Sequence, residues 1–167
     1  GAATESLRAV LVGGYHGAWI DARQLAAVTL DDAGLGEIGA SLATGVIVAL
    51  DASACPVQEV ARTVWWLAEQ SAGQCGPCAN GLSAVAMLLR TVGQGRAGAG
   101  AFQRLERWRH QLPGRGACHL PDGAMRFLAS GLDTFLEEFE RHHRHGPCAA
   151  CARPTTLVAA PHGQAVA

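Results

Sequence analysis

The pattern of hydrophobic and polar positions changes character near residue 55. Before it, an apolar run over residues 8–14 ends at paired glycines, and a Val- and Ile-rich run covers residues 45–51. Short apolar runs bounded by turn residues are typical of strands. The second run predicts a strand buried on both faces. Two strands do not make an independent sheet. We therefore expect either further strands upstream or packing of residues 1–54 against the helical residues C-terminal to them.

From residue 55 onward, the apolar positions recur every three to four residues, the spacing of amphipathic helices. Four helices are predicted, over residues 56–72, 79–93, 99–112 and 121–145. Their apolar stripes are Val57, Val60, Val64 and Leu67; Leu82, Val85, Leu89 and Val92; Ala101, Leu105, Trp108 and Leu112; and Met125, Leu128, Leu132, Phe135, Leu136 and Phe139. Helices joined by short loops favour an antiparallel up-down bundle, here over residues 55–145.

Beyond Gly146 the composition shifts to Pro, Gly, Ala and Thr without a period, so residues 146–167 are expected to form a flexible, mostly disordered tail. The predicted fold class is therefore α+β. No apolar run approaches the ~18–20 residues that cross a bilayer, which argues against membrane insertion. The N-terminus lacks an apolar leader, which favours a cytoplasmic location, either free or peripheral to a membrane complex.

The amino-acid composition argues against several classes of function. Hydrophobic residues make up 49% of the chain and charged residues only 16%, which is typical of a folded domain rather than a disordered one. The net charge of −1 leaves no basic surface for nucleic acid, so that partner is not expected. The sequence shows no Ser-His-Asp set, no paired carboxylates and no G-x-G-x-x-G motif, and no catalytic residue is assigned.

The six cysteines carry the candidate chemistry. In an up-down bundle the first and third loops lie at the same end. Cys75 and Cys78 fall in the first loop and Cys118 in the third, so these three are expected to converge. The remaining cysteines precede the first helix or follow the fourth, and are expected at the opposite end; they are Cys55, Cys148 and Cys151. A helix of about 17–25 residues separates the two groups by roughly 25–37 Å.

Three converging thiolates on glycine-rich loops suit an iron–sulfur cluster. Gly73, Gly76 and Gly116 would shape these loops, whose backbone N–H groups favour an anionic cluster. A zinc ion with His119 as fourth ligand is the alternative. It ranks lower because adjacent residues rarely both ligate one tetrahedral ion.

At this point the motifs resemble a known family. The segments Ala68-Glu-Gln-Ser-Ala-Gly-Gln-Cys-Gly-Pro-Cys-Ala-Asn-Gly81 and Gly114-Arg-Gly-Ala-Cys118 resemble the C-terminal iron–sulfur region of the NADH-binding 51 kDa (F-type) subunit of NADH:quinone oxidoreductase. Related diaphorase subunits of hydrogenases and formate dehydrogenases share this region. The segments Val10–Gly17 and Gly39–Asp51 resemble the later half of the family's β-grasp (SLBB) domain. The resemblance covers about residues 8–145.

The resemblance implies that Cys75, Cys78 and Cys118 bind an iron–sulfur cluster, but the family's first cluster cysteine falls on Ala72. Candidates for the missing ligand are Ser71, His119, His16, water and a partner chain. A [4Fe–4S] cluster with three Cys ligands is expected, or a [3Fe–4S] cluster if the position stays unfilled.

The family's flavin- and NADH-binding region has no counterpart in these 167 residues. The resemblance therefore implies that FMN and NADH enter only through an upstream domain or a flavoprotein partner. A downstream acceptor protein would take the electrons. The interpretation is an electron-transfer module of an NADH dehydrogenase-like oxidoreductase.

Several alternatives stay open. Cys75-Gly-Pro-Cys78 is also the sequence of thioredoxin-type dithiols, although those follow a strand rather than a helix. A cluster-free or zinc-stapled interaction domain is the runner-up function. Cys148 and Cys151 with the histidines at 142, 143 and 145 would form a second metal site. A solvated histidine-rich helix end is the favoured interpretation there, and Cys55 is expected to be a small buried hydrophobe.

Overall fold

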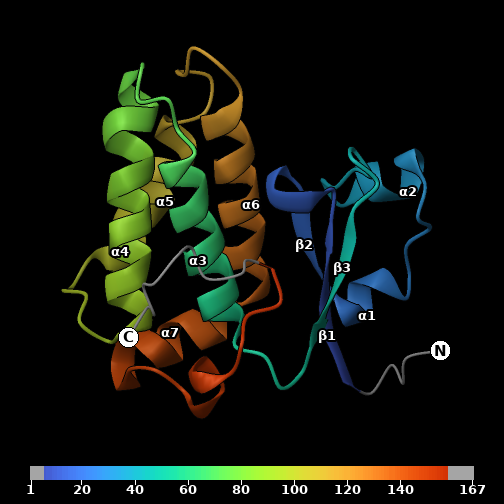
Figure 1. Cartoon of the computed structure of the whole chain (residues 1–167). Helices are drawn as coiled ribbons and strands as arrows, with labels where there is room; N and C mark the ends of the chain where they lie inside the picture. The colour runs from blue at the N-terminus through green and yellow to red at the C-terminus, as the bar shows by residue number, and fades with distance from the viewer. Residues whose placement is uncertain (1–5, 158–167) are drawn as a thin grey trace.

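A computed structural model describes residues 6–157 of the chain. The fold is α+β, with a small sheet beside a group of longer helices (Figure 1). The sheet contains three antiparallel strands in the order β2-β1-β3. The strands are β1 (Leu7–Val12), β2 (Ala18–Asp21) and β3 (Ile47–Asp51). Two short helices, α1 (Ala22–Leu25) and α2 (Asp32–Glu37), lie between β2 and β3 in the chain.

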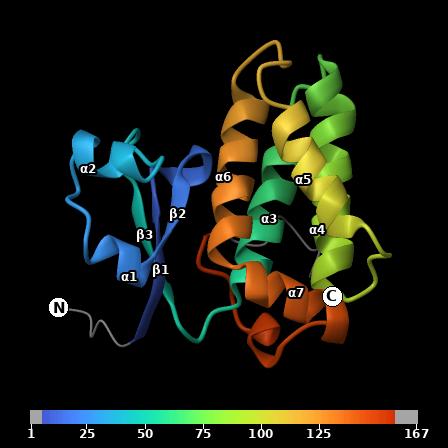
Figure 2. The same ribbon diagram turned by 180° about the vertical axis from the view of Figure 1, so that it is seen from behind.

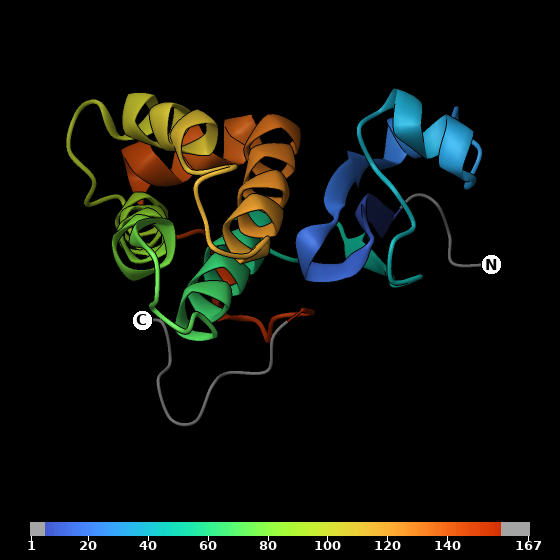
Figure 3. The same ribbon diagram turned by 90° about the horizontal axis from the view of Figure 1, so that it is seen from above.

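The central strand β1 is buried on both faces, and this differs from the prediction. Ala9 and Leu11 belong to the core shared with the long helices, whereas Val10 and Val12 pack in a second cluster with Leu35 of α2. Figure 3 shows the sheet standing between the two short helices and the long ones. The strand that was expected to be doubly buried, β3, lies at the sheet edge and buries only Leu50 in its range. Position in the sheet, rather than apolar content, decides which strand is covered on both sides.

The strand β2 was not predicted. Its three buried residues Ala18, Trp19 and Ile20 follow a tight turn through the 3₁₀ helix Gly14–His16. This turn needs glycine at position 17, because a Cβ there would lie 1.9 Å from the carbonyl oxygen of Val12. Three consecutive apolar residues show no alternation, and so short a run beside glycines is not distinguished from a turn by its sequence.

The helical part begins at Pro56, as predicted. Its helices are α3 (Pro56–Glu69), α4 (Ser83–Gly93), α5 (Ala101–Gln111), α6 (Leu120–Thr134) and α7 (Leu136–His145), and a π-helical segment, Pro77–Leu82, leads into α4. Contacts join α3 to α4, α4 to α5, α5 to α6 and α3 to α6. No helix within residues 6–157 is long and apolar enough to cross a membrane.

The predicted helix over residues 121–145 is in fact two helices. The break falls at Phe135, whose backbone leaves the helical region (φ −121°, ψ 28°). Phe135 and Phe139 remain buried, but Leu136 is 48% exposed instead of belonging to the core stripe. Beyond the break, α7 runs across the end of the other helices (Figure 2). The apolar pattern continues through the break because both helices bury aromatic residues, which is why periodicity did not reveal it.

The segment after α7 also departs from expectation. Residues 146–157 pack against the helices: a 3₁₀ helix covers Ala149–Ala152, and Leu157 touches the core. The backbone N–H groups of Thr156 and Leu157 donate to the carboxylate of the buried Glu59. These hydrogen bonds satisfy two backbone donors and the buried Glu59 carboxylate, so they hold residues 156 and 157 against the helices. The rest of the tail lies outside the described residues.

Candidate iron–sulfur and metal-binding sites

The first and third helical loops meet at one end of the molecule, at the top of Figure 1. Cys75 lies in the loop after α3, and Cys118 lies in the loop before α6. The backbone N–H of Ala117, next to Cys118, is hydrogen bonded to the Cys75 thiol. Together with the N–H of Cys78 it lowers the pKa of Cys75 below the usual range of a thiol. The two loops therefore touch at the cysteines that the sequence singled out.

Cys78 lies at the buried side of this group, in the π-helical segment. Burial raises the pKa of its thiol, and negative charge on Cys75 and Cys118 raises it further. The hydroxyl of Ser71 is hydrogen bonded to the same thiol and acts in the opposite direction. Cys118 is exposed, so the three sulfurs extend from the interior to the surface.

Among the candidates for a fourth ligand, Ser71 is the one that contacts a cysteine of this group. The side chain of His119 is 98% exposed, and its Nδ1 lies 2.9 Å from the carboxylate of Asp122. His16 packs against α6, where a Cβ added at Gly123 would lie 2.3 Å from its ring. Of these candidates, the Ser71 hydroxyl is therefore the one beside the Cys78 thiol.

At two of the three loop glycines, the structure shows why a residue without a side chain is needed. Gly73 has a positive φ of 67°, and a Cβ at Gly116 would lie 2.7 Å from the carbonyl oxygen of Cys118. Gly76 has neither a positive φ nor a close neighbour, so nothing in the structure requires glycine there. A further close approach at Gly81, where a Cβ would meet Leu112 at 2.6 Å, helps to bring the third loop against the first.

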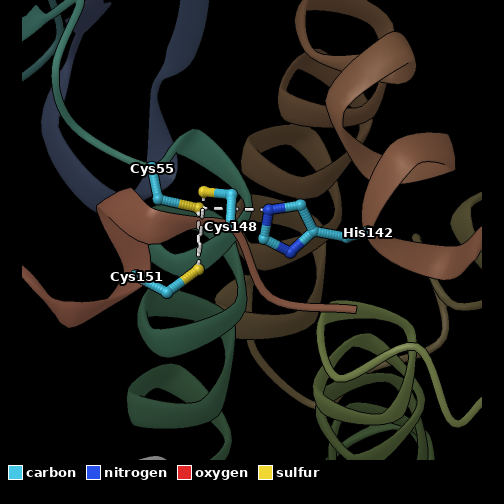
Figure 4. Close-up of side chains that lie close together, drawn as sticks. All are labelled: Cys55, His142, Cys148 and Cys151. Atoms are coloured by element: carbon cyan, nitrogen blue, oxygen red, sulfur yellow. Dashed lines mark hydrogen bonds between the residues drawn. The ribbon is translucent and has the colours of Figure 1, made fainter. Parts of the chain in front are cut away.

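The other three cysteines meet at the opposite end together with His142 (Figure 4). Their four ligand atoms all lie within 4.8 Å of one another. Cys55 precedes α3, His142 belongs to α7, and Cys148 and Cys151 lie in the segment after it. Burial raises the pKa of the thiols of Cys55 and Cys151.

This second group corrects the interpretation of the histidine-rich helix end. His142 is 1% exposed rather than solvated, and Cys55 is not merely a small hydrophobe because its sulfur faces other ligand atoms. His143 packs edge-on against Phe102, and His145 is exposed. The sequence contained a signal, a C-x-x-C pair close to histidines, but the expected disorder of the tail argued against it.

Both ends thus present cysteine groups on an α+β frame, which defines a small metal- or cluster-binding module. Residues 58–142 match the family described as the NADH-ubiquinone oxidoreductase-F iron-sulfur binding region. The chain belongs to this family. Its function class is that of an iron–sulfur electron-transfer module, as the sequence predicted, and the cluster-free interaction domain is not favoured.

Relatives agree with this assignment, and a solved structure has a similar fold. The chain is 33% identical over 115 residues to the F-type subunit of NADH-quinone oxidoreductase from Streptomyces coelicolor, covering 69% of this chain and 26% of that protein. It is 30% identical over 142 residues to the F 2 form of this subunit from Rhizobium meliloti, covering 85% and 34%. The fold is similar to a chain of an NAD⁺-reducing [NiFe]-hydrogenase in the H₂-reduced state, with a TM-score of 0.72, 21% identity, and coverage of 83% and 23%. The chain therefore spans about a quarter to a third of the length of the curated relatives it matches.

Proposed function

We propose that Cys75, Cys78 and Cys118 hold one [4Fe–4S] cluster, with the hydroxyl of Ser71 as the fourth protein ligand. The observation that carries this proposal is the meeting of the first and third helical loops at one end of the molecule (Figure 1), where the backbone N–H of Ala117, next to Cys118, lowers the pKa of the Cys75 thiol. Iron–sulfur clusters usually take four protein ligands, and Ser71 lies against Cys78 immediately before the position at which the family cysteine is missing.

The residues around the site would favour an anionic group. The backbone N–H groups of Ala117 and Cys78 lower the pKa of the Cys75 thiol and so favour its thiolate, and the Cys78 N–H also donates to the Cys75 carbonyl oxygen. The helical stretch Pro77–Gly93 begins at the site, so its positive dipole end faces the thiolates. The buried Cys78 keeps water from the inner side. When bound, the cluster supplies reversible one-electron transfer.

We further infer that this module works beside a flavin site that it does not itself contain. The relatives are F-type subunits of NADH-quinone oxidoreductases, and the chain spans only about a quarter to a third of them. An FMN- and NADH-binding domain or subunit would supply electrons, and an acceptor protein would remove them. The exposed loop around Cys118 is the side of the site that an acceptor can approach. The three-stranded sheet would correspond to part of the family's SLBB-type β-grasp unit.

Metal analysis of anaerobically purified protein tests the cluster. About four iron and four sulfide per chain are expected, with an EPR signal in the reduced state. Replacing Cys75, Cys78 and Cys118 by alanine together should remove iron, sulfide and the visible absorption. The control Ser83→Ala, on the exposed start of α4, should keep all three. Wild-type protein that takes up neither iron nor sulfide on reconstitution would contradict the proposal.

A paired substitution tests the fourth ligand. Ser71→Ala should lower the iron content to about three per chain, with an EPR signal in the oxidised state, because one iron loses its protein ligand. Adding Ala72→Cys to this variant should restore about four iron, since a thiol then stands at the family's position. If Ser71→Ala alone keeps four iron and an unchanged spectrum, Ser71 is not a ligand.

A further inference from the structure

The cysteine and histidine group at the α7 end has the spacing of ligands around a single ion. The Cys151 and Cys55 sulfurs are 3.4 Å apart, Cys148 and Cys151 are 3.8 Å apart, and the Cys55 sulfur lies 3.6 Å from His142 Nε2. A tetrahedral Zn²⁺ with Zn–S bonds of about 2.3 Å holds two thiolates about 3.8 Å apart. The observed spacings therefore fit four ligands converging on one metal.

The orientation of His142 supports the same conclusion. Its Nδ1 lies 3.0 Å from the carbonyl oxygen of Gly93, so Nδ1 carries the proton and donates to that oxygen. The lone pair of Nε2 then points toward the sulfurs, in a side chain that is 1% exposed. Histidine ligands of metals are commonly held in this way, with the second ring nitrogen bonded to a backbone carbonyl.

Two other interpretations, an iron–sulfur cluster and a disulfide, do not account for all of these distances. In a four-iron cluster each ligand binds a different iron, which keeps the ligand atoms farther apart than those of a single ion. A disulfide would use only two of the three cysteines. It would not explain why the third thiol and the His142 imidazole also converge on the same point. Four protein ligands that include three cysteines are typical of closed, structural zinc sites.

We propose that Cys55, His142, Cys148 and Cys151 bind one structural Zn²⁺ ion, at the end of the molecule opposite Cys75, Cys78 and Cys118. The site goes beyond the proposed electron-transfer function and does not depend on it. Zinc has no redox chemistry of its own, so the ion would have a structural role only.

The structural role arises from the three segments that supply the ligands. Cys55 stands where the chain passes from the sheet to α3, His142 is on α7, and Cys148 and Cys151 belong to the terminal segment. At the end of α7, Gly146 has a φ of 79°, which lets the chain turn back toward Cys55. The bound ion would tie these segments together.

Beyond the site, the terminal segment continues along α3 toward the sheet. The backbone N–H groups of Thr156 and Leu157 lie 2.6 and 3.1 Å from the carboxylate oxygens of Glu59. The Tyr15 hydroxyl, next to the sheet, donates to the carbonyl oxygen of Leu157. A metal at Cys148 and Cys151 would thus anchor a strap that joins the helices to the sheet side of the molecule.

Elemental analysis and zinc K-edge absorption test the site in the full chain, purified anaerobically in reductant and offered both zinc and iron. About one zinc per chain is expected, with three sulfurs near 2.3 Å and one nitrogen near 2.0–2.1 Å. His142→Ala and Cys148→Ser should each lower the zinc content at least tenfold and leave the iron and sulfide content unchanged. His145→Ala, an exposed histidine of the same helix, is the matched control and should retain the zinc.

The wild-type measurement keeps the test decisive if a ligand variant fails to fold. Zinc below a tenth of an equivalent in the wild-type protein would overturn the proposal, as would iron rather than zinc bound by the three sulfurs and the imidazole nitrogen. A Cys148–Cys151 disulfide in freshly prepared anaerobic protein would also overturn it. Wild-type protein that binds zinc but neither iron nor sulfide would support the zinc site and count against the cluster at Cys75, Cys78 and Cys118.

Discussion

At the scale of single residues, the two cysteines of the C-x-x-C motif in the first loop have different surroundings. Cys75 is partly exposed and receives backbone hydrogen bonds, which lower the pKa of its thiol. Cys78 is buried, and burial raises the pKa of its thiol. The two residues are close in sequence, but one faces backbone donors near the surface and the other faces the core.

This difference predicts unequal reactivity in cluster-free protein. Iodoacetamide should modify Cys75 faster than Cys78 at neutral pH, because the thiolate is the reactive form and only Cys75 is both accessible and favoured as a thiolate. The rate at Cys75 should persist at pH values where an ordinary thiol is protonated, and fall only below its lowered pKa. Peptide mapping after timed alkylation measures both rates. Equal rates at the two positions would contradict this assignment of the pKa shifts.

The missing cluster cysteine shows how far single residues could be assigned from the sequence. Comparison of the family motif with this chain placed Ala72 at the missing position and left several candidates for its replacement. Choosing among them required side-chain directions. His119 turns to Asp122, His16 packs on α6 and Ser71 faces Cys78. These directions depend on the folded arrangement of the loops and helices around each side chain.

At the scale of elements, helix α6 passes close to both α3 and the sheet at Gly131. A Cβ at this position would lie 2.8 Å from Cγ2 of Val60 and 3.3 Å from Cδ1 of Trp19. Val60 is fully buried and β-branched, so its side chain cannot easily turn away. The close contact of α6 with both layers therefore depends on glycine.

Gly131→Ala is expected to destabilise the protein by about 1–2 kcal/mol, because overpacking exceeds the gain in helix propensity. The matched control is Gly36→Ala in α2, where a Cβ meets nothing within 4 Å. That change should stabilise the protein by about 0.4–1 kcal/mol. Urea unfolding of both variants measures the difference. A neutral or stabilising effect of Gly131→Ala would contradict this prediction, because it would show that α3 and α6 can move apart without lowering the free energy of unfolding.

The division of the last predicted helix also belongs to this scale. Helical periodicity correctly placed α3, α4, α5 and the start of α6 to within a few residues, since each buries a continuous stripe. It did not place the break at Phe135. A helix that turns there still buries Phe135 and Phe139, so the one-dimensional pattern is the same in both cases.

At the scale of the whole molecule, the sheet and the helices share one core. The Trp19 ring of β2 packs against Phe127 and Phe135, with ring centroids 5.9 and 5.3 Å apart. Its backbone N–H donates to the Ser130 hydroxyl at 3.0 Å. An ion pair joins Arg8 of β1 to Glu138 of α7. The two predicted regions, residues 1–54 and 55–145, are therefore in extensive contact.

We expect residues 1–54 and 55–145 to unfold in one cooperative transition, because neither buries its apolar surface without the other. Far-UV circular dichroism and tryptophan fluorescence should give coincident thermal curves in zinc- and iron-replete protein. Trp19→Phe should lower the midpoint of both curves together. Two separate transitions would show that the regions are independent domains.

The sequence by itself determined the α+β class, the helical segments as far as Thr134 and the division of the six cysteines between two ends. Each of these rests on local periodicity and on the alternation of helices joined by short loops, which fixes the end at which a loop lies. Only the tertiary structure decided the path after Phe135. The turn of α7 and the return of the chain at Gly146 place His142 and Cys148 beside Cys55. That convergence depends on packing between segments far apart in the chain, and the spacing of residues along the sequence does not encode it.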